Sequence, residues 1–463
     1  MSVLTLSEYV ESVRKKRVAV IGIGVSNTPL IELLLRGGCR VTACDKRTRE
    51  QMGEEAERLE ALGAELKLGE DYLEGLDHDL IFRTPGLMPF DPHLQAAVER
   101  GSVLTSEMEV FFRLCPCRII AVTGSDGKTT TTTIIAELLK AAGRRVHLGG
   151  NIGHPLLCDV PDMREDDVAV LELSSFQLHS MVCRPDVAVI TNLTPNHLDK
   201  HRDFQDYIDA KRSILDGQSE DDLLILNADD DHTPYYAGFA KAQTRYFSDQ
   251  SAVENGAFKE NDRLYRVCKG KKREIMRCDE IRIPGEHNVL NYLAAFAATD
   301  GLVSDEICRA VAMDFAGVEH RLEEVRVLHG VTYINDSIAS SPTRTIAGLH
   351  ALKTKPIILL GGYDKHIPFD SLGEELCRYA KRAILTGATA EKIRRAIEEA
   401  PSFKSSPLPY EMIADFREAV LTASDRAEAG DIVILSPACA SFDHFKNFAE
   451  RGKAFKTIVM ELA

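Results

Sequence analysis

Short apolar runs alternate with helical patterns along most of this chain, and this alternation restricts its fold more than any other feature. In most of these runs the apolar residues are consecutive, whereas a strand with one solvent-exposed face alternates apolar and polar residues. Consecutive apolar residues are typical of strands that are buried on both faces of a parallel sheet. We therefore predict an α/β fold. The runs are RVAVIGIG (17–24), RVTACD (40–45), DLIFRTPG (79–86), RIIAVTG (118–124), DVAVLELSS (167–175), PDVAVITNL (185–193), DDLLILNADD (221–230), GVTYIND (330–336), KPIILLGG (355–362), RAILTG (382–387) and DIVILSPA (431–438).

The distribution of these runs predicts three domains, and a length of 463 residues suits that number. We place a Rossmann-like N-terminal domain at 1–107, a central P-loop ATPase-like domain with a parallel sheet at 108–316, and a Rossmann-like C-terminal domain at 317–463. Residues 245–283 differ in character, because short alternating runs are separated there by Asn, Gly and Lys turns. We expect this segment to form an antiparallel flap on the central domain.

Charge and cysteine content exclude several classes of protein. The formal net charge of -15 disfavours a surface for nucleic acid or anionic membranes, since both need clustered cations. The eleven cysteines contain no CxxC pair, which is typical of reduced thiols in the cytosol. The N-terminus has no apolar secretory segment, and no apolar run reaches the length of a membrane span. We expect a cytoplasmic, monomeric enzyme that binds neither nucleic acid nor a membrane.

The stretch AVTGSDGKTTTTT (121–133) predicts a phosphate-binding loop. Only two residues separate its first glycine from the Gly-Lys pair, so it is shorter than the usual P-loop. Because it joins an apolar run to a helical pattern, backbone N–H groups and the helix N-terminus can meet phosphate oxygens. We expect Lys128 to reach the β- and γ-phosphates of ATP, and the hydroxyl of Thr129 or Thr130 to bind Mg²⁺. The alternative is a glycine turn that only caps a helix. The predicted ATP contacts are Gly124, Ser125, Asp126, Gly127, Lys128, Thr129 and Thr130.

A second glycine turn, GIGVSN (22–27), begins like a dinucleotide-binding fingerprint. Asn27 stands where the third glycine of that fingerprint belongs. Asp45 ends the next apolar run, where such folds place an acid against a ribose or base. The turn predicts a module that holds a nucleotide diphosphate, with no sign of a redox cofactor. A simple tight turn is the alternative.

Three polar residues of the central domain are candidate metal ligands. Glu172 ends an apolar run, where an unpaired carboxylate would be costly to bury unless a metal bound it. His197 follows another run in TNLTPNHLDKH, and Lys211 lies in the helical pattern YIDAKRSI. Taken singly, the histidine and the lysine are more often surface or core residues than ligands.

Several of these motifs together resemble the Mur ligase family of bacterial cell-wall synthesis. The resemblance rests, in chain order, on TGSDGKTTT, GGNIG (149–153), LELSSFQL, TNLTPNHLDKH, GEHNVLNYLAA (285–295), EHRLE (319–323) and INDSIASSP (334–342). The related folylpolyglutamate synthases share the central motifs. The C-terminal LSPACASFDHFKNFAERGKAF (435–455) resembles more narrowly the branch that adds D-glutamate to UDP-N-acetylmuramoyl-L-alanine, and RTPGL (83–87) is similar to that branch as well.

The resemblance implies an ATP-dependent amide ligase. In such an enzyme the γ-phosphoryl group of ATP moves to a substrate carboxylate, and an amine then displaces phosphate from the acyl phosphate. It implies two Mg²⁺ ions, the first held by Thr129 and Glu172 and the second by His197. Lys128, His197 and Lys211 are the catalytic residues it suggests. Asn288, Asn291, Arg321 and Asp336 would complete the ATP contacts; Ser26, Asn27, Asp45, Thr84, Gly86, Asn151 and His197 would contact UDP-N-acetylmuramoyl-L-alanine; Ser340, Lys365, Ser441 and Phe448 would contact D-glutamate.

For Lys211 the resemblance implies a carbamate, formed with CO₂, that would bind the second Mg²⁺. Two positions depart from the family pattern: Ile338 replaces the lysine of NDSKAT, and Tyr363 makes the surroundings of Lys365 unusual. A different amide ligase of the family, such as a folylpolyglutamate synthase or another muramoyl-peptide ligase, is the competing enzyme. A non-catalytic nucleotide-binding protein is the competing class.

Overall fold

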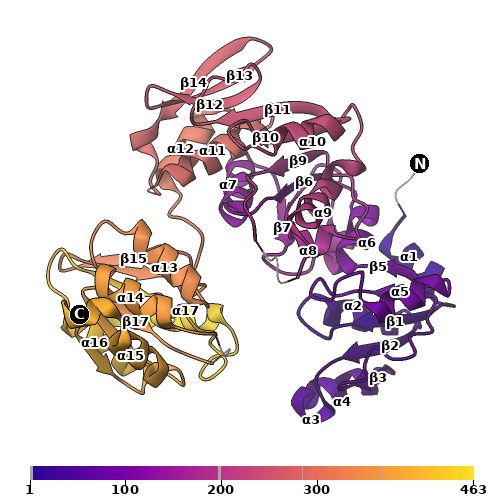
Figure 1. The fold of residues 1–463 in the computed structure, drawn as a ribbon. Helices are drawn as coiled ribbons and strands as arrows, with labels where there is room; N and C mark the ends of the chain where they lie inside the picture. The colour runs from indigo at the N-terminus through magenta and orange to yellow at the C-terminus, as the bar shows by residue number, and fades with distance from the viewer. Residues whose placement is uncertain (1–3, 197–199, 284, 365–366) are drawn as a thin grey trace. The chain divides into compact units, whose positions relative to one another are not determined.

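The computed structural model divides into two compact units, Met1–Phe315 and Ala316–Ala463. The first unit contains two β-sheets and the second unit contains one, each with helices packed on it (Figure 1). The α/β prediction is confirmed. The residues that the structure describes are 4–196, 200–283, 285–364 and 367–463.

The N-terminal sheet has five strands in the order β3-β2-β1-β4-β5, and all of its strand pairs are parallel. Successive residues of β1 enter different cores, because side chains alternate across a strand. Val18 and Val20 pack with helix α2, and Ala19 and Ile21 pack with helix α5. The elements are α1 (Leu6–Val13), β1 (Arg17–Ile21), α2 (Asn27–Arg36), β2 (Arg40–Asp45), α3 (Arg49–Met52), α4 (Glu54–Ala61), β3 (Glu65–Leu68), β4 (Leu80–Phe82), α5 (Pro92–Glu99) and β5 (Val103–Thr105).

The second sheet has nine strands in the order β14-β13-β12-β11-β10-β9-β6-β8-β7. The pairs from β7 to β12 are parallel, whereas β12, β13 and β14 pair antiparallel. The elements are α6 (Glu107–Leu114), β6 (Arg118–Thr123), α7 (Lys128–Ala141), β7 (Val146–Gly150), η1 (Leu157–Asp162), β8 (Val168–Glu172), α8 (Ser175–Leu178), β9 (Val187–Ile190), α9 (Phe204–Asp216), β10 (Leu223–Asn227), α10 (Thr233–Phe239), β11 (Gln243–Ser248), β12 (Gly256–Glu260), β13 (Arg263–Cys268), β14 (Lys271–Arg277), η2 (Cys278–Glu280), α11 (Glu286–Ala298) and α12 (Asp305–Asp314).

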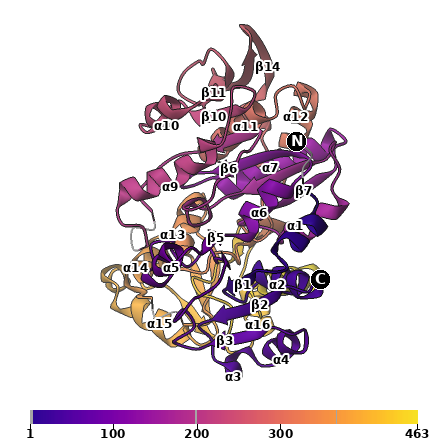
Figure 2. The ribbon, with the colours of Figure 1, turned by 90° about the vertical axis from the view of Figure 1, so that its right-hand side faces the viewer.

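The predicted flap is therefore the antiparallel edge of this sheet, not a separate domain. Helices cover both faces of the central strand β6, which explains its continuous apolar run. Ile119 and Ala121 share a core with α9, whereas Ile120 and Val122 share another with α7 and α11. Figure 2 shows β6 with α7 and α9 beside it.

The second unit contains a six-stranded sheet in the order β15-β16-β20-β17-β18-β19. Only the β15–β16 pair is antiparallel. Ile358 and Leu360 pack with α14 and α15, while Ile357 and Leu359 pack with α16 and α17. The elements are β15 (Glu323–Leu328), β16 (Val331–Asn335), α13 (Pro342–Ala351), β17 (Ile357–Leu360), α14 (Asp370–Tyr379), β18 (Arg382–Leu385), α15 (Ala390–Glu399), η3 (Pro401–Lys404), β19 (Tyr410–Met412), α16 (Phe416–Asp425), β20 (Ile432–Leu435) and α17 (Phe448–Glu461).

The predicted boundary between residues 107 and 108 falls in the first turn of α6, inside the first compact unit. One hydrophobic core joins the two sheets of that unit, since residues of β1 and β6 belong to it. All eleven cysteines are free thiols. Within the described ranges, none of the helices combines the length and the apolar character of a membrane span.

Candidate active site

The phosphate-binding loop lies between the end of β6 and the start of α7, as predicted from the sequence. Its two glycines occupy conformations that other residues avoid, with φ of 145° at Gly124 and 76° at Gly127. Neighbouring side chains also leave no room there. A Cβ atom on Gly124 would lie 1.9 Å from the hydroxyl of Thr191, and one on Gly127 would lie 2.3 Å from the Asn291 side-chain oxygen. The short loop is therefore packed tightly against the ends of β9 and α11.

Side chains from neighbouring elements hold the loop in shape. The backbone N–H of Asp126 donates to the side-chain oxygen of Asn192 at 2.9 Å, and the hydroxyl of Thr191 donates to the Asp126 carbonyl at 2.6 Å. The buried Ser125 hydroxyl lies 2.9 Å from the hydroxyl of Tyr207 on α9. The Ser125 backbone N–H also donates to the Asn192 carbonyl at 2.9 Å, so both its side chain and its main chain fix the loop to neighbouring elements.

Lys128, the first residue of α7, bends back over the loop. Its Nζ donates to the carbonyl oxygens of Gly124 at 3.0 Å and Ser125 at 2.8 Å. These contacts place a cation at the mouth of the loop, where phosphate groups carry their charge. Thr129 and Thr130 follow in the first turn of the helix, and Thr130 is buried.

Glu172 lies next to this loop because β8 pairs with β6 and places Glu172 opposite Val122. Only 2% of the residue is exposed. One carboxylate oxygen accepts a hydrogen bond from the Asn151 amide at 2.7 Å. The other, Oε2, is buried and has no hydrogen-bond partner among the described residues. A buried carboxylate oxygen without a partner fits a hard divalent cation such as Mg²⁺, which takes oxygen ligands.

Lys211 comes to the same loop from α9. It is 1% exposed, and its Nζ donates to the Gly124 carbonyl at 2.7 Å and lies 4.5 Å from the Tyr207 ring centre. Burial and, to a smaller extent, the nearby Lys128 cation hold the pKa of Lys211 well below its usual value. Taken by itself, the sequence pattern favoured a surface or core lysine over a ligand, and the structure excludes the surface position.

Two predicted site residues, His197 and Lys365, lie outside the described residues. Asn288 and Asn291, expected near the adenine, are both buried on α11. The Asn291 amide donates to the Asn288 side-chain oxygen at 3.1 Å, and its own oxygen accepts from the Thr131 hydroxyl at 3.2 Å. The pair therefore ties α11 to the helix that follows the phosphate loop.

A polar cluster that we did not predict joins α8 to the start of α9. His201 Nδ1 lies 2.8 Å from the Asp206 carboxylate, and His201 Nε2 lies 2.9 Å from the Ser175 hydroxyl. His179 Nε2 lies 3.0 Å from the same carboxylate. These distances are hydrogen-bond lengths, and three of the four ring nitrogens of the two histidines have partners. Hydrogen bonding therefore explains why His179, His201 and Asp206 lie together, without a bound metal ion. Burial lowers the pKa of His201, which favours its neutral form. His201 stands in the quoted motif TNLTPNHLDKH, but its partners could not be foreseen from spacing.

The N-terminal sheet carries an open pocket of about 520 Å³ at the glycine turn after β1. Asp45 is buried beside it, and its carboxylate accepts from the backbone N–H of Ile23 at 2.7 Å and from Arg47 Nε at 3.1 Å. Asn27 is also buried, and its amide donates to the carbonyls of Ile21 and Gly22. Both side chains hold the turn together. The pocket is lined by Ile23, Gly24, Val25, Thr28, Pro29, Glu32, Arg47, Glu55 and Arg58.

Arg47 and Arg58 are the cations of this pocket, and neither belongs to a motif that we recognised in the sequence. Arg47 lies only two residues after Asp45, at a strand end, which is a signal that could have been used. Arg83, in the RTPGL motif, was missed too. Its buried guanidinium donates to the carbonyl of Phe176 at 2.8 Å and to the Ser180 hydroxyl at 2.9 Å. It therefore joins the loop containing Thr84 and Gly86 to helix α8, which follows strand β8 of the second sheet.

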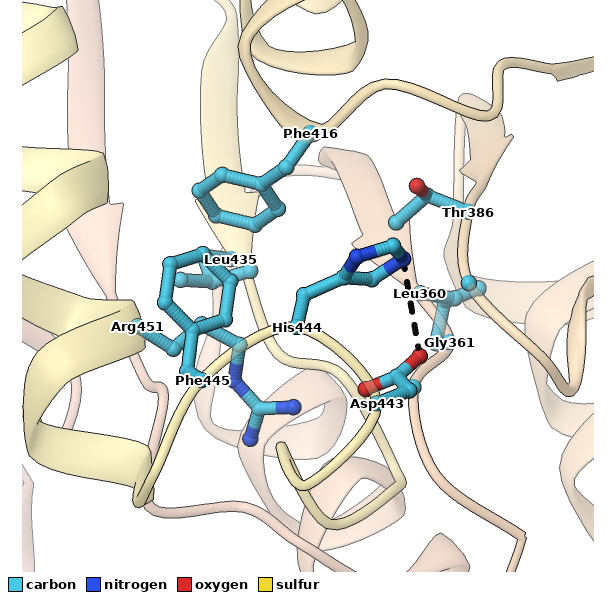
Figure 3. A pocket seen from close by; sticks show the side chains of 11 residues that line it. Leu360, Gly361, Thr386, Phe416, Leu435, Asp443, His444, Phe445 and Arg451 are labelled. Carbon is cyan, nitrogen blue, oxygen red and sulfur yellow. Dashed lines mark ion pairs between the residues drawn. The ribbon is translucent and has the colours of Figure 1, made fainter.

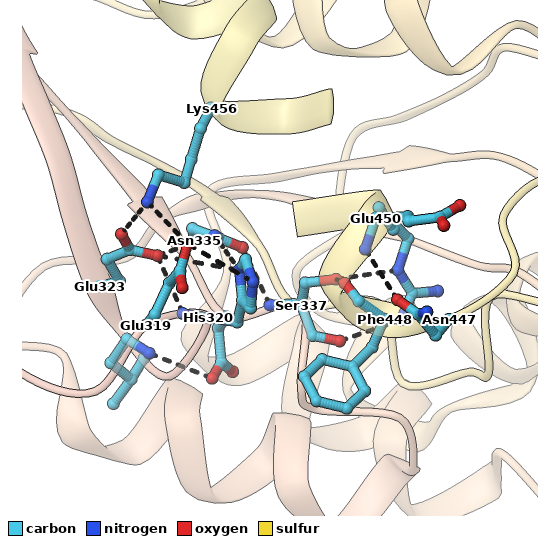
Figure 4. A network of polar contacts seen from close by, with 12 residues as sticks. Glu319, His320, Glu323, Asn335, Ser337, Asn447, Phe448, Glu450 and Lys456 are labelled. Atoms are coloured by element: carbon cyan, nitrogen blue, oxygen red, sulfur yellow. Dashed lines mark hydrogen bonds and ion pairs between the residues drawn. The ribbon is translucent and has the colours of Figure 1, made fainter. Parts of the chain in front are cut away.

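In the second unit, Asp336 and Ser340 lie in the loop after β16, and Ser441 lies in the loop after β20. The Asp336 carboxylate is buried and accepts from the Ser436 hydroxyl at 2.7 Å and from the Leu322 N–H at 3.2 Å. Burial raises the pKa of Asp336 to about 6. The neighbouring Ser337 hydroxyl donates to the Phe448 carbonyl at 2.8 Å, and the network around it extends to His320 and Lys456 (Figure 4).

Ser441 is buried in the loop after β20, whereas Phe448 begins α17 and is partly exposed. The ring of Phe448 packs edge-on against His320 with centroids 6.0 Å apart. A small cavity behind this loop, with a volume of about 10 Å³, has room for roughly one water molecule. Figure 3 shows it among Phe416, Thr386, His444 and Arg451.

Comparison with known proteins assigns the chain to a family. The family model described as Mur ligase middle domain matches residues 122–299, and the model described as Mur ligase, glutamate ligase domain, matches residues 320–439. The chain is 49% identical to a UDP-N-acetylmuramoylalanine–D-glutamate ligase of Acetivibrio thermocellus, with 98% of each chain covered. It is 47% identical to the protein of the same name from Clostridium novyi, with 99% of each covered.

Solved structures show the same fold. UDP-N-acetylmuramate-alanine ligase MurC from Thermotoga maritima matches with a TM-score of 0.58 and 18% sequence identity, covering 96% of this chain and 99% of that one. The sequence relatives match nearly the whole chain. The region matched by the middle-domain model contains the phosphate loop, Glu172 and Lys211, and the region matched by the glutamate ligase model contains Asp336. The chain belongs to the Mur ligase family.

Proposed function

We propose that this protein is an ATP-dependent ligase that joins D-glutamate to UDP-N-acetylmuramoyl-L-alanine in peptidoglycan precursor synthesis. The observation that carries the proposal is the short phosphate loop with Lys128 at its mouth and the unpaired Glu172 carboxylate oxygen beside it. The names of the sequence relatives, at 47–49% identity over nearly the full length, support the two substrates. ATP and nucleotide-linked sugars are cytoplasmic compounds, so we propose that the enzyme works in the cytoplasm. We also propose that it acts as a monomer.

The proposed reaction has two steps. The substrate carboxylate attacks the γ-phosphorus of ATP, ADP leaves, and an acyl phosphate forms. The amine of D-glutamate then attacks the acyl carbon, loses a proton and displaces phosphate, which leaves an amide. Such transfer depends on positioning and on electrostatic stabilisation of phosphoryl oxygens. Lys128 is placed for that stabilisation, since its Nζ lies over the loop carbonyls of Gly124 and Ser125.

Magnesium is part of the proposal, and the donor set fits it. Glu172 Oε2 has no hydrogen-bond partner among the described residues, and the hydroxyls of Thr129 and Thr130 stand on the first turn of α7. We propose that Thr129 and Glu172 hold one ion, and that His197 and a modified Lys211 hold a second. When bound, such ions supply positive charge to phosphoryl and carboxylate oxygens. Asn151 would orient the Glu172 carboxylate through its 2.7 Å hydrogen bond.

Lys211 is proposed to carry a carbamate. Its lowered pKa favours the neutral amine, whose lone pair can attack CO₂. The N–C bond forms, one proton leaves to water, and a carbamate anion results. This change replaces an amine that donates hydrogen bonds with oxygens that bind a hard cation. The carbamate anion would also be attracted to the nearby Lys128 cation, which disfavours a proton on the Lys211 amine.

The substrate contacts are proposals that the local geometry supports to different degrees. The pocket of the N-terminal sheet suits a nucleotide diphosphate, with Arg47 and Arg58 as cations. For UDP-N-acetylmuramoyl-L-alanine we propose contacts from Ser26, Asn27, Asp45, Thr84 and Gly86. We propose that Asn288, Asn291, Arg321 and Asp336 contact ATP. For D-glutamate we propose Ser340, Lys365, Ser441 and Phe448.

A phosphate-release assay tests the proposal directly. The enzyme is incubated with ATP, Mg²⁺, UDP-N-acetylmuramoyl-L-alanine and each of a panel of amino acids. We expect D-glutamate alone to give high turnover. Turnover with a folate substrate and L-glutamate, or with a different muramoyl peptide, would assign another ligase activity. No ATP-dependent product with any pair would point to a non-catalytic nucleotide-binding protein.

A further inference from the structure

A buried arginine in the second unit has a role that neither the motifs nor the proposed contacts assign. Arg451 lies on α17, is 3% exposed, and directs its guanidinium under the carboxyl ends of the central strands. Among the described residues, no carboxylate forms an ion pair with it. Its partners are backbone carbonyls and one hydroxyl, which is an unusual environment for a buried cation.

The guanidinium joins two loops. Nε donates to the Ser337 hydroxyl at 3.1 Å, and one terminal nitrogen donates to the Ser337 carbonyl at 3.0 Å. The same terminal nitrogen donates to the Cys439 carbonyl at 3.0 Å, and the other donates to the Ala440 carbonyl at 3.1 Å. Ser337 follows β16, while Cys439 and Ala440 follow β20. One planar group therefore connects the loop 336–341 to the loop 436–441.

These loops occupy the place where parallel sheets bind ligands. β16 and β20 are adjacent and parallel, with Asn335 opposite Leu435, so both loops leave the sheet at the same edge. Ligands of open α/β sheets bind at the carboxyl ends of their strands. The two loops contain Ser340 and Ser441, the serines that we propose for the amino-acid substrate.

The second loop needs an external support. Ala438 has φ of 59°, a left-handed conformation that costs energy for any residue with a Cβ. Such a conformation persists only where surrounding contacts hold it. Arg451 binds the carbonyls of the two residues that follow Ala438, and the Thr389 hydroxyl lies 3.0 Å from the Cys439 sulfur. The guanidinium is the charged part of that support.

We infer that Arg451 is a positioning residue of the amino-acid site, which fixes the 336–341 and 436–441 loops relative to each other so that they can receive the substrate carboxylates. The inference rests on the proposed function, since it names D-glutamate as the ligand of those loops. Lysine cannot replace arginine in this role. Its single ammonium has three donors and no planar fork, and cannot reach both loops with the same geometry.

The test compares Arg451→Lys with the wild-type enzyme in the phosphate-release assay. We expect the KM for D-glutamate to rise by about 10- to 100-fold, because several buried acceptors lose their donor. The dissociation constant for UDP-N-acetylmuramoyl-L-alanine, measured by calorimetry, should not change, since the N-terminal sheet holds that pocket. An unchanged KM for D-glutamate in a folded variant would overturn the inference.

Arg266→Lys is the matched control. Arg266 is also a fully buried arginine, but it belongs to the flap of the first unit and pairs with Asp305 at 2.7 Å. Its replacement should lower thermal stability and leave the KM for D-glutamate unchanged. An equal rise in KM in both variants would reduce the effect to general destabilisation and would refute a specific role for Arg451.

Chemical rescue separates positioning from folding. Arg451→Ala opens a space in the shape of the lost side chain, and guanidinium ion far below denaturing concentrations should restore part of the D-glutamate affinity. Methylammonium at the same concentration should not. Rescue by neither cation in a variant with a native circular-dichroism spectrum would count against the inference. The wild-type assay alone tests the proposed function: if the wild-type enzyme does not use D-glutamate, the proposed function is wrong, whatever the variants do.

Discussion

The Nζ atom of Lys211 lies 2.7 Å from the carbonyl oxygen of Gly124 and donates a hydrogen bond to it. These residues are 87 positions apart in the chain. The contact brings a buried amine from α9 to the first residue of the phosphate loop. Since Glu172 and Lys128 also contribute electrostatically to the pKa of Lys211, the four residues form one interacting site.

Lys211→Ala should lose most of the ligase activity, and added short-chain carboxylates should restore part of it. The reason is that a carboxylate can supply the oxygens that the proposed carbamate provides. Lys211→Arg should also be inactive, because arginine keeps a cation and cannot form a carbamate. Phosphate release measures both, with Lys140→Ala, an exposed lysine paired with Glu137, as the control. An active Lys211→Arg enzyme would exclude the carbamate.

Lys128→Ala should reduce ATP-dependent phosphate release by about 10²- to 10³-fold, as is typical for loss of a group that stabilises transition-state charge. Binding of UDP-N-acetylmuramoyl-L-alanine should stay within about twofold of wild type, because distant sites contribute additively. Calorimetry without ATP measures that affinity. A parallel loss of affinity for the UDP substrate would show that the two sites are not independent.

Gly127→Ala should impair ATP binding more than Gly143→Ala. Both glycines have positive φ, 76° and 79°, so both substitutions carry a similar backbone strain of about 1 kcal/mol. Only at Gly127 would the new Cβ meet another side chain, the Asn291 oxygen at 2.3 Å; at Gly143 no atom lies within 4 Å. Nucleotide titration and thermal unfolding of both variants test this. Equal ATP affinities would mean that the loop tolerates a shift of Asn291.

Glu107→Gln should stabilise the protein at high pH. Burial raises the pKa of Glu107 to about 7, and its side chain accepts from the Leu157 N–H at 3.0 Å. The folded protein therefore holds a proton that the unfolded chain releases near pH 4.5, so this group's contribution to stability falls as pH rises from about 4.5 to 7. A glutamine keeps the oxygen that accepts from the Leu157 N–H. Because it does not ionise, its contribution to stability does not fall as the pH rises.

The stability difference between Glu107→Gln and wild type should thus grow between pH 5 and pH 8, by on the order of 3 kcal/mol at most. Urea unfolding at the two pH values measures it, and Glu137→Gln, an exposed glutamate, should show no such growth. A constant difference between the two pH values would mean that Glu107 ionises normally in the folded state.

Local sequence was sufficient to predict strands in each of the three sheets and the phosphate loop, although β3, β5, β7, β15 and β19 matched none of the apolar runs. The apolar runs coincide with β1, β2, β4, β6, β8, β9, β10, β16, β17, β18 and β20, because strands that are buried on both faces consist largely of apolar residues. The loop was predictable since its glycines and Lys128 are contiguous. The antiparallel flap was predictable from its short alternating runs and turn residues.

Side-chain partners could not be predicted in the same way. Asn27 and Asp45 were predicted to contact a ligand, and this stays a prediction. The structure adds that their side chains hydrogen-bond to backbone groups of the glycine turn, which spacing did not indicate. Arg83 and Arg451 lie in quoted motifs, but nothing in the sequence indicated that either side chain is buried. Their burial depends on elements 93 and 114 positions away, at Phe176 and Ser337.

The sequence by itself determined where buried strands and the phosphate loop occur, because periodicity and glycine placement act over a few residues. The tertiary structure alone decided which polar groups face each other. Strand order places Glu172 beside Val122, and helix packing brings Lys211 to Gly124. The energy of a buried charge depends on partners within a few ångströms in space, and those partners come from remote parts of the chain.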